Sequence, residues 1–364
     1  MAKFQAVIAI LVPLIAALLL AWPVIKWLRG ARTRRIARQV RFFHEEGYVI
    51  VPDVFDPAEL GPLRRELAAA IHVKVQALQA EGKLTNPHAD LDFNHRLTAI
   101  YRDSKENGEA VMRHIEGSRG GGFRAPEMFA VITHPKLLAW VAALLGTEEI
   151  VGSSVYRVRP KVPNVGRGVV PWHQDSGYFV PSCDQHLIVT CWIPLVDATE
   201  ENGCMRILPR VHDGSVVEHH KGGNAGFLVI KDENLPDDPR KSVPAPCPRG
   251  GVVFMTNRTP HCSTPNRTNV VRWSLDLRYQ SADAPNNIGA LPESIDGAGK
   301  ADAAFYEGSN VACYPPEADF VVKSAKDPSS VTSYQEYVRR REVYEQVKAG
   351  FVTRNWTHSM ADEP

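Results

Sequence analysis

Between residues 150 and 279 the chain is a series of short apolar runs separated by turn-forming residues, and this pattern limits the fold more than any other feature. Proline, glycine, asparagine and aspartate cluster between the runs, as they do between short strands. The runs cover residues 150–159, 172–179, 187–195, 204–208, 226–230, 252–255 and 270–279. Short strands at this density predict a closed or two-sheet β-structure such as a jelly roll.

Helices are expected on both sides of this β-region. Residues 47–51 predict a short strand, and Asp56, Pro57 and Glu59 form the N-cap, N1 and N3 signals of a helix that ends near Gly82. Apolar residues recur along that helix at three- and four-residue intervals. Residues 135–145 and 330–348 predict two further helices. Residues 83–125 are polar and give no secure assignment, and 281–318 are expected to be irregular.

The N-terminus has the character of a membrane anchor. Residues 4–25 carry no charge, and as a helix they would span roughly 33 Å, close to the hydrocarbon thickness of a bilayer. Seven Lys and Arg residues follow between 26 and 41, which predicts that the C-terminal part faces the cytoplasm. A cleaved signal peptide is the alternative, but Ala21-Trp22-Pro23 is a poor cleavage site.

These patterns predict four segments. They are an anchor at 1–28, a basic juxtamembrane helix at 29–46, a jelly-roll domain at 47–350 and a tail at 351–364. The fold class expected is mainly β with flanking helices, plus one transmembrane helix.

Charge and cysteine content exclude several classes of protein. The 42 basic and 41 acidic residues leave a net charge of +1, so nucleic acid is not an expected partner. The six cysteines form no CxxC pair, which argues against a zinc ribbon or a disulfide scaffold.

The strongest chemical signal is His173-Gln174-Asp175 together with His261. On an extended strand, residues two apart point to the same face, so His173 and Asp175 could chelate one metal ion. A second His from another strand would complete a two-His, one-carboxylate site. That set leaves one side of the metal open, which suits a non-haem Fe(II) oxygenase, although three such ligands fit other metals too.

Arg272 narrows the choice of metal chemistry. It lies in the apolar run 270–275, where a guanidinium is costly unless it is paired with an anion. Its planar fork suits a carboxylate, which favours a carboxylate-bearing cosubstrate.

Four segments resemble the phytanoyl-CoA dioxygenase family of Fe(II)- and 2-oxoglutarate-dependent oxygenases. They are WHQD at 172–175, CWIPLVDATEENGCMRILPRVHDG at 191–214, RGGVVFMTNRTPHCSTPN at 249–266 and NVVRWSLDLRYQ at 269–280. The resemblance covers residues 40–350 and implies a double-stranded β-helix of the cupin-like kind. It departs from the usual Pro-Gly-Ser-His turn at Pro209-Arg210-Val211-His212, which is interpreted as a local variant that leaves the site intact.

The resemblance also implies roles for individual residues. His173, Asp175 and His261 would bind Fe(II), and Arg272 would hold the distal carboxylate of 2-oxoglutarate. The residues implied around that cosubstrate are Ser263 as a further donor, and Trp192 and Gln174 as lining. Oxygen is the second cosubstrate. Because related halogenases lack the carboxylate ligand, Asp175 favours hydroxylation.

Other basic residues are weaker candidates. Lys161 and Arg167 could contact an anionic substrate, but a solvated loop is the preferred interpretation. His219 and His220 resemble a metal pair, yet adjacent strand residues point to opposite faces, so they are expected to lie on the surface.

The sequence therefore predicts a single-pass membrane protein whose cytoplasmic domain hydroxylates a small or lipid-like substrate. An acyl-CoA substrate does not follow from the resemblance, because one fold serves many substrates. Two alternatives remain open: a catalytically silent, membrane-tethered scaffold, and a zinc hydrolase with the same three ligands.

Overall fold

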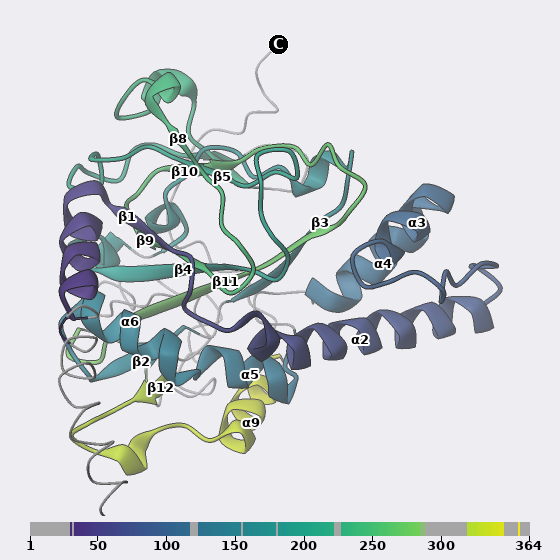
Figure 1. Cartoon of the computed structure of the whole chain (residues 1–364), viewed down its shortest axis with the longest axis horizontal. Coiled ribbons are helices and arrows are strands. Elements are labelled where there is room, and N and C mark those ends of the chain that lie inside the picture. The colour runs from purple at the N-terminus through teal and green to yellow at the C-terminus, as the bar shows by residue number, and fades with distance from the viewer. Residues whose placement is uncertain are drawn as a thin grey trace, which may run out of the picture.

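The computed structural model describes residues 30, 33–116, 123–153, 156–179, 181–221, 227–284, 286, 288, 319–345 and 356. A large antiparallel sheet separates a smaller sheet on one side from helices on the other (Figure 1). The β-rich fold with flanking helices is therefore confirmed. The predicted membrane span at 4–25 lies outside the described residues, as does the tail apart from Trp356.

The large sheet is built mainly from the apolar runs seen in the sequence. Its strand order is β1-β9-β4-β11-β2-β12, and β3 pairs with β11 beside β2. The strands are β1 (Tyr48–Val51), β2 (Ile150–Gly152), β3 (Arg157–Lys161), β4 (Ile188–Pro194), β9 (Val252–Thr256), β11 (Arg272–Ser281) and β12 (Phe320–Lys323). Neighbouring pairs are antiparallel, and the central pair β11–β4 joins Asp276 to Trp192.

A small sheet with strand order β10-β5-β8 faces the large one. It contains β5 (Met205–Ile207), β8 (Val243–Ala245) and β10 (His261–Ser263). Two strands of two residues each, β6 (His220–Lys221) and β7 (Leu228–Val229), pair antiparallel in a separate sheet. Two antiparallel sheets face to face, with distant strands adjacent in space, give the predicted two-sheet arrangement.

The long N-terminal helix forms as its sequence signals predict. Asp56 and Glu59 make a capping box at η1 (Pro57–Leu60), and α2 (Gly61–Ala80) continues from it. The apolar residues at three- and four-residue spacing are all buried in the core: Leu60, Leu63, Leu67, Ile71, Val75 and Leu78. Residues 33–46 are also helical, within the predicted basic helix.

The structure assigns much of the region that the sequence left open. α3 (Arg96–Asp103) and α4 (Lys105–Glu116) lie within 83–125, and α5 (Pro126–Ile132) leads to α6 (Pro135–Leu145). α6 ends at Gly146 with φ 71°, as expected for a glycine C-cap. The C-terminal helix α9 covers Tyr334–Glu345.

Among the described residues, one stretch, Pro126–Leu145, is long and apolar enough to cross a membrane. Half of it is buried inside the protein, and it is divided between α5 and α6. Its apolar residues belong to the main hydrophobic core, so we interpret both helices as core helices of the domain.

The alternation of side chains along the strands separates the core from the site. On β11, Trp273, Leu275 and Leu277 face the helices and join the main core. Arg272, Ser274, Asp276 and Arg278 occupy the alternate positions and line a cavity between the two sheets. A second, smaller core, which includes Trp192, Val253 and Met255, also lies between the sheets.

Two strand predictions are wrong in detail. The run 150–159 is divided into β2 and β3. Residues 172–179 form no strand: His173 makes an isolated bridge to His261, and Asp175–Tyr178 forms the 3-10 helix η3. Ser176 N–H donates to the carbonyl of Asn257, 2.9 Å away, and Asn257 directly follows β9.

The unusual turn at 209–212 is stabilised from outside the cavity. Arg210 adopts φ 64°, a conformation that favours glycine. Its N–H donates to the Glu46 carbonyl at 3.0 Å, and its Nε lies 2.8 Å from Glu46 Oε1. Neither Arg210 nor Glu46 lines the cavity between the sheets, in agreement with a local variant.

Candidate active site

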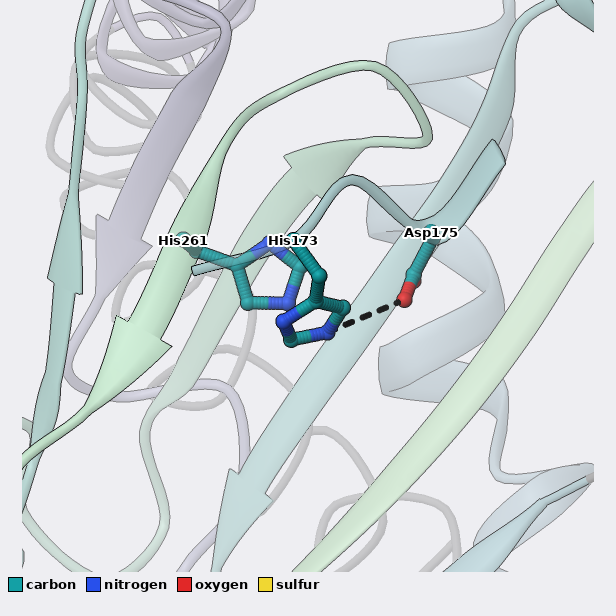
Figure 2. A group of neighbouring side chains, drawn as sticks. All are labelled: His173, Asp175 and His261. Carbon is teal, nitrogen blue, oxygen red and sulfur yellow. Dashed lines mark ion pairs between the residues drawn. The ribbon is translucent and has the colours of Figure 1, made fainter. Parts of the chain in front are cut away.

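His173, Asp175 and His261 converge at the edge of the small sheet (Figure 2). Each offers one ligand atom, and these atoms all lie within 4.8 Å of one another. His173 Nε2 is 3.8 Å from Asp175 Oδ1, and the two imidazole centroids are 4.2 Å apart. All three side chains are buried. The structure therefore brings together the three residues that the sequence singled out.

Both imidazoles carry a proton on Nδ1, so each can offer its Nε2 to a metal ion. His173 Nδ1–H donates to the Pro171 carbonyl and His261 Nδ1–H donates to the Thr259 carbonyl, both at 2.9 Å. A carbonyl only accepts, so the proton sits on Nδ1 and the Nε2 lone pair is available. Burial, followed by the neighbouring His261, lowers the pKa of His173 well below its usual range, which keeps it neutral.

Arg278 and Thr190 hold the Asp175 carboxylate. Arg278 Nε lies 3.0 Å from Oδ2 and its Nη2 lies 3.0 Å from Oδ1, while Thr190 Oγ1 donates to Oδ2 at 2.5 Å. Burial opposes ionisation, but the Arg278 guanidinium outweighs it and keeps the pKa of Asp175 well below its usual range. Asp175 is therefore an anionic ligand at neutral pH.

The backbone around His173 explains how the ligands stay together. His173 and His261 exchange two backbone hydrogen bonds, 3.0 and 2.9 Å long. Behind them, His219 Nε2 accepts from the Gln174 N–H at 3.0 Å. A Cβ added at Gly177 would lie 2.6 Å from that Nε2, so only glycine fits against His219. The sequence analysis expected His219 on the surface, because no local signal near it indicates this contact.

Two expectations about this region are corrected. Gln174 does not line the cavity, because its amide donates to the Arg258 carbonyl at 2.7 Å and accepts from Val217 N–H at 2.9 Å. His219 and His220 are buried rather than exposed. Adjacent residues do point to opposite sides, but packed structure covers both sides here.

Arg272 lies in the same cavity as the ligands. It is only 3% exposed, and its guanidinium lies 5.0 Å from the centroid of the Trp192 ring. Its Nη1 donates to Ser274, while its buried Nε has no partner within the described residues. Burial lowers the pKa of Arg272 to about 10, so it remains charged at neutral pH. A buried guanidinium with an unused donor fits an anionic ligand.

Lys161 accompanies Arg272, contrary to the expectation of a solvated loop. It belongs to β3, pairs in register with Arg272 and is 2% exposed. Its Nζ donates to Ser263 Oγ at 2.7 Å. Burial, and then Arg272, lower the pKa of Lys161 to about 6. Within the described chain, no carboxylate forms an ion pair with either cation. Arg167 lies in η2 (Gly166–Gly168), and its side chain is outside the described part.

One cavity of about 290 Å³ joins the ligand triad to these cations. Its lining includes Lys161, Arg272, Trp192 and Ser263 together with the three ligands. The donor set of two imidazoles and one carboxylate fits Fe(II). The basic pocket fits the distal carboxylate of 2-oxoglutarate.

A comparison with known protein families decides the classification. The phytanoyl-CoA dioxygenase family model matches residues 43–274, which contain all three ligands and Arg272. The chain belongs to the phytanoyl-CoA dioxygenase family. Its relatives include human peroxisomal phytanoyl-CoA dioxygenase, 24% identical over 254 residues, which are 67% of this chain and 68% of the human protein.

Other relatives differ widely in their named substrates. A probable alpha-ketoglutarate-dependent hypophosphite dioxygenase of Stutzerimonas stutzeri is 25% identical over 258 residues, 68% of this chain and 79% of that protein. Among solved structures, EvdO2 from Micromonospora carbonacea var. aurantiaca with 2-oxoglutarate has a TM-score of 0.45. It is 24% identical and covers 67% of this chain and 90% of its own.

Family membership and the donor set together define the class of enzyme. The protein is a non-haem iron, 2-oxoglutarate-dependent dioxygenase. His173, Asp175 and His261 would hold the iron, and Arg272 with Lys161 would face the cosubstrate.

Proposed function

We propose that this enzyme hydroxylates a C–H bond of a small or lipid-like substrate. The observation that carries the proposal is that the ligand triad and the buried Arg272 share one cavity. The overall reaction balances as substrate, O2 and 2-oxoglutarate giving hydroxylated substrate, succinate and CO2. The bound iron supplies the oxidative chemistry by joining O2 reduction to decarboxylation of the cosubstrate.

The chain's own residues hold the reactants in place. Arg272, Lys161 and Ser263 would bind the distal carboxylate, and Trp192 covers the guanidinium of Arg272. Arg278 and Thr190 keep Asp175 ionised and oriented for the metal. The burial of His173, Asp175 and His261 limits the access of water to them, which protects the reaction from side products.

Asp175 supports hydroxylation over halogenation. A halogenase of related architecture needs an open ligand position for chloride, and the carboxylate of Asp175 would occupy that position here. Arg278 and Thr190 hold this carboxylate firmly in place.

Two other functions fit the chain less well. A zinc hydrolase could use the same three ligands, but it would leave the buried pair Lys161 and Arg272 without a role. A catalytically silent scaffold would have no need for the buried guanidinium of Arg272, which is costly to keep without an anionic partner.

We also propose that residues 4–25 anchor the enzyme in a membrane, with the catalytic domain facing the cytoplasm. The support is the uncharged span of 22 residues and the basic residues after it. An anchor would raise the local concentration of a membrane-associated substrate. Deletion of residues 1–28 should move the protein from the membrane pellet to the supernatant. Retention in the pellet would reject an anchor limited to these residues.

The test of the proposed reaction is a search for its product. The full-length enzyme and its His173→Ala variant are expressed in parallel under ¹⁸O2, and small molecules and lipids are compared by mass spectrometry. The proposal expects a compound that gains one labelled oxygen only with the unchanged enzyme. Labelled products that are identical in both cultures would reject it.

A further inference from the structure

One residue of the C-terminal tail lies against the loop that carries two of the metal ligands. Trp356 Nε1–H donates to the Gly177 carbonyl at 2.8 Å, although the two residues are 179 positions apart in sequence. The Trp356 ring also packs on the His219 imidazole, with the ring centroids 5.1 Å apart. His219 is fully buried, whereas Trp356 is partly exposed. The indole therefore contacts the loop through one hydrogen bond and one ring contact.

Both contacts of Trp356 lead directly to the ligand loop. Gly177 belongs to η3, the 3-10 helix that begins at Asp175, and its N–H donates to the Gln174 carbonyl at 2.9 Å. His219 Nε2 accepts from the Gln174 N–H at 3.0 Å. Gln174 lies between two of the three ligands in sequence. Both backbone groups of Gln174 are thus bound by residues that Trp356 contacts.

His219 has a defined orientation on which the indole can pack. Its Nδ1–H donates to the Val217 carbonyl at 2.8 Å, because a carbonyl only accepts. This tautomer leaves the Nε2 lone pair for the Gln174 N–H. A rotation of the imidazole would break both hydrogen bonds, and the Trp356 ring packed against the imidazole opposes such a rotation.

Trp356 lies apart from the reactants and from the family match. Among the described residues, those that line the active-site cavity do not include Trp356. It also lies beyond residues 43–274, the part of the chain that the family model matches. Its effect on the site is therefore exerted through the ligand loop.

We propose that Trp356 is a positioning residue for the metal site. It holds Gln174 and Gly177 in the conformation that directs His173 and Asp175 toward the metal. This inference rests on the proposed function, because it takes His173 and Asp175 as metal ligands. A loop that is ordered before the metal binds loses less conformational entropy on binding, so the contact should contribute to metal affinity.

The test measures metal binding without turnover. Co(II) is titrated in the absence of oxygen into the full-length apo-protein and into its Trp356→Phe and Trp356→Ala variants. Trp356→Phe keeps an aromatic ring but removes the N–H donor to Gly177. It should raise the Co(II) dissociation constant about three- to tenfold, as expected for the loss of one hydrogen bond. Trp356→Ala also removes the ring contact with His219 and should raise the constant further.

A matched control separates positioning from general stability. Trp140 packs against the main core, with its ring 6.2 Å from that of Phe254, and Trp140→Phe should leave the Co(II) dissociation constant unchanged. Trp356 variants that lose unfolding free energy but bind Co(II) like the unchanged protein would overturn the inference. His173→Ala tests the ligand assignment separately. Undiminished Co(II) binding by His173→Ala would reject that assignment, whatever the Trp356 variants do.

Discussion

Arg278 donates to both carboxylate oxygens of Asp175, with Nε 3.0 Å from Oδ2 and Nη2 3.0 Å from Oδ1. Arg278 comes from the central strand of the large sheet, whereas Asp175 follows the segment that pairs with the small sheet. The bidentate pair therefore joins the two sheets at the metal site and orients one ligand by a residue that does not itself bind metal.

Removing this pair should weaken the metal site. Arg278→Gln is expected to raise the dissociation constant for Co(II) by about 10- to 100-fold, the usual cost of losing a partner of a metal ligand. Anaerobic titration of the apo-protein measures this constant. Arg65→Gln makes the same chemical change at an exposed position of α2 and should leave this constant unchanged. Equal Co(II) affinities in the two variants would show that Arg278 does not strengthen metal binding through Asp175.

Cosubstrate binding should depend on pH through Lys161. Its pKa of about 6 makes it largely neutral at pH 8, and a bound carboxylate would stabilise its charged form. Binding would therefore take up a proton, and affinity for 2-oxoglutarate should rise as pH falls from 8 to 6, by at most about tenfold per unit. Calorimetry on the Mn(II)-saturated enzyme measures this slope.

Lys161→Met should bind the cosubstrate more weakly and lose this slope. Burial raises the pKa of the nearby Cys262 to about 12 and also raises that of Cys204, so neither thiol titrates between pH 6 and 8. A slope that persists in Lys161→Met would assign the proton to another group.

Gly177 should tolerate no side chain. A Cβ there would lie 2.6 Å from His219 Nε2, and His219 in turn accepts from the Gln174 N–H. Gly177→Ala is expected to lower the free energy of unfolding by about 1–3 kcal/mol. At Gly214 the nearest atom to an added Cβ is 3.5 Å away, so Gly214→Ala is the control. Denaturant unfolding measures the free energy of unfolding of both variants. Equal values would contradict the close contact between Gly177 and His219.

The packing of α2 can be tested with two substitutions on the same helix. Leu67 is fully buried, and Leu67→Ala should cost about 2–5 kcal/mol of unfolding free energy. Val73 is 58% exposed, and Val73→Ala should cost almost nothing. Thermal unfolding distinguishes the two, and equal losses would contradict the observed face of the helix.

The sequence predicted those elements whose signals are local. The capping box at Asp56, the glycine after α6 and the periodicity of α2 are formed by residues a few positions apart, and each was located correctly. The prediction failed at 172–179, where distant groups determine the backbone: Asn257 accepts from Ser176, and His219 accepts from Gln174.

The same contrast between local and distant signals explains why only part of the site was predicted. The ligand triad was identified because two His and one Asp form a recognisable metal-binding set even without a structure. Lys161 was assigned to solvent because its partner strand, β11, lies more than 100 residues away in sequence. The period of two along β11 was a usable signal: Arg272, Ser274, Asp276 and Arg278 alternate with apolar residues, and this pattern could have assigned all four to one face.

The central claim is tested most directly by formation of succinate from 2-oxoglutarate in the metal-free enzyme after addition of one metal at a time. Fe(II) with O2 should restore turnover, Zn(II) should not, and neither His173→Ala nor Asp175→Ala should respond to iron. Arg272→Ala should need a much higher concentration of 2-oxoglutarate while its iron requirement stays nearly the same. Turnover with Zn(II), or iron-dependent succinate formation that survives His173→Ala, would contradict the assignment of this site.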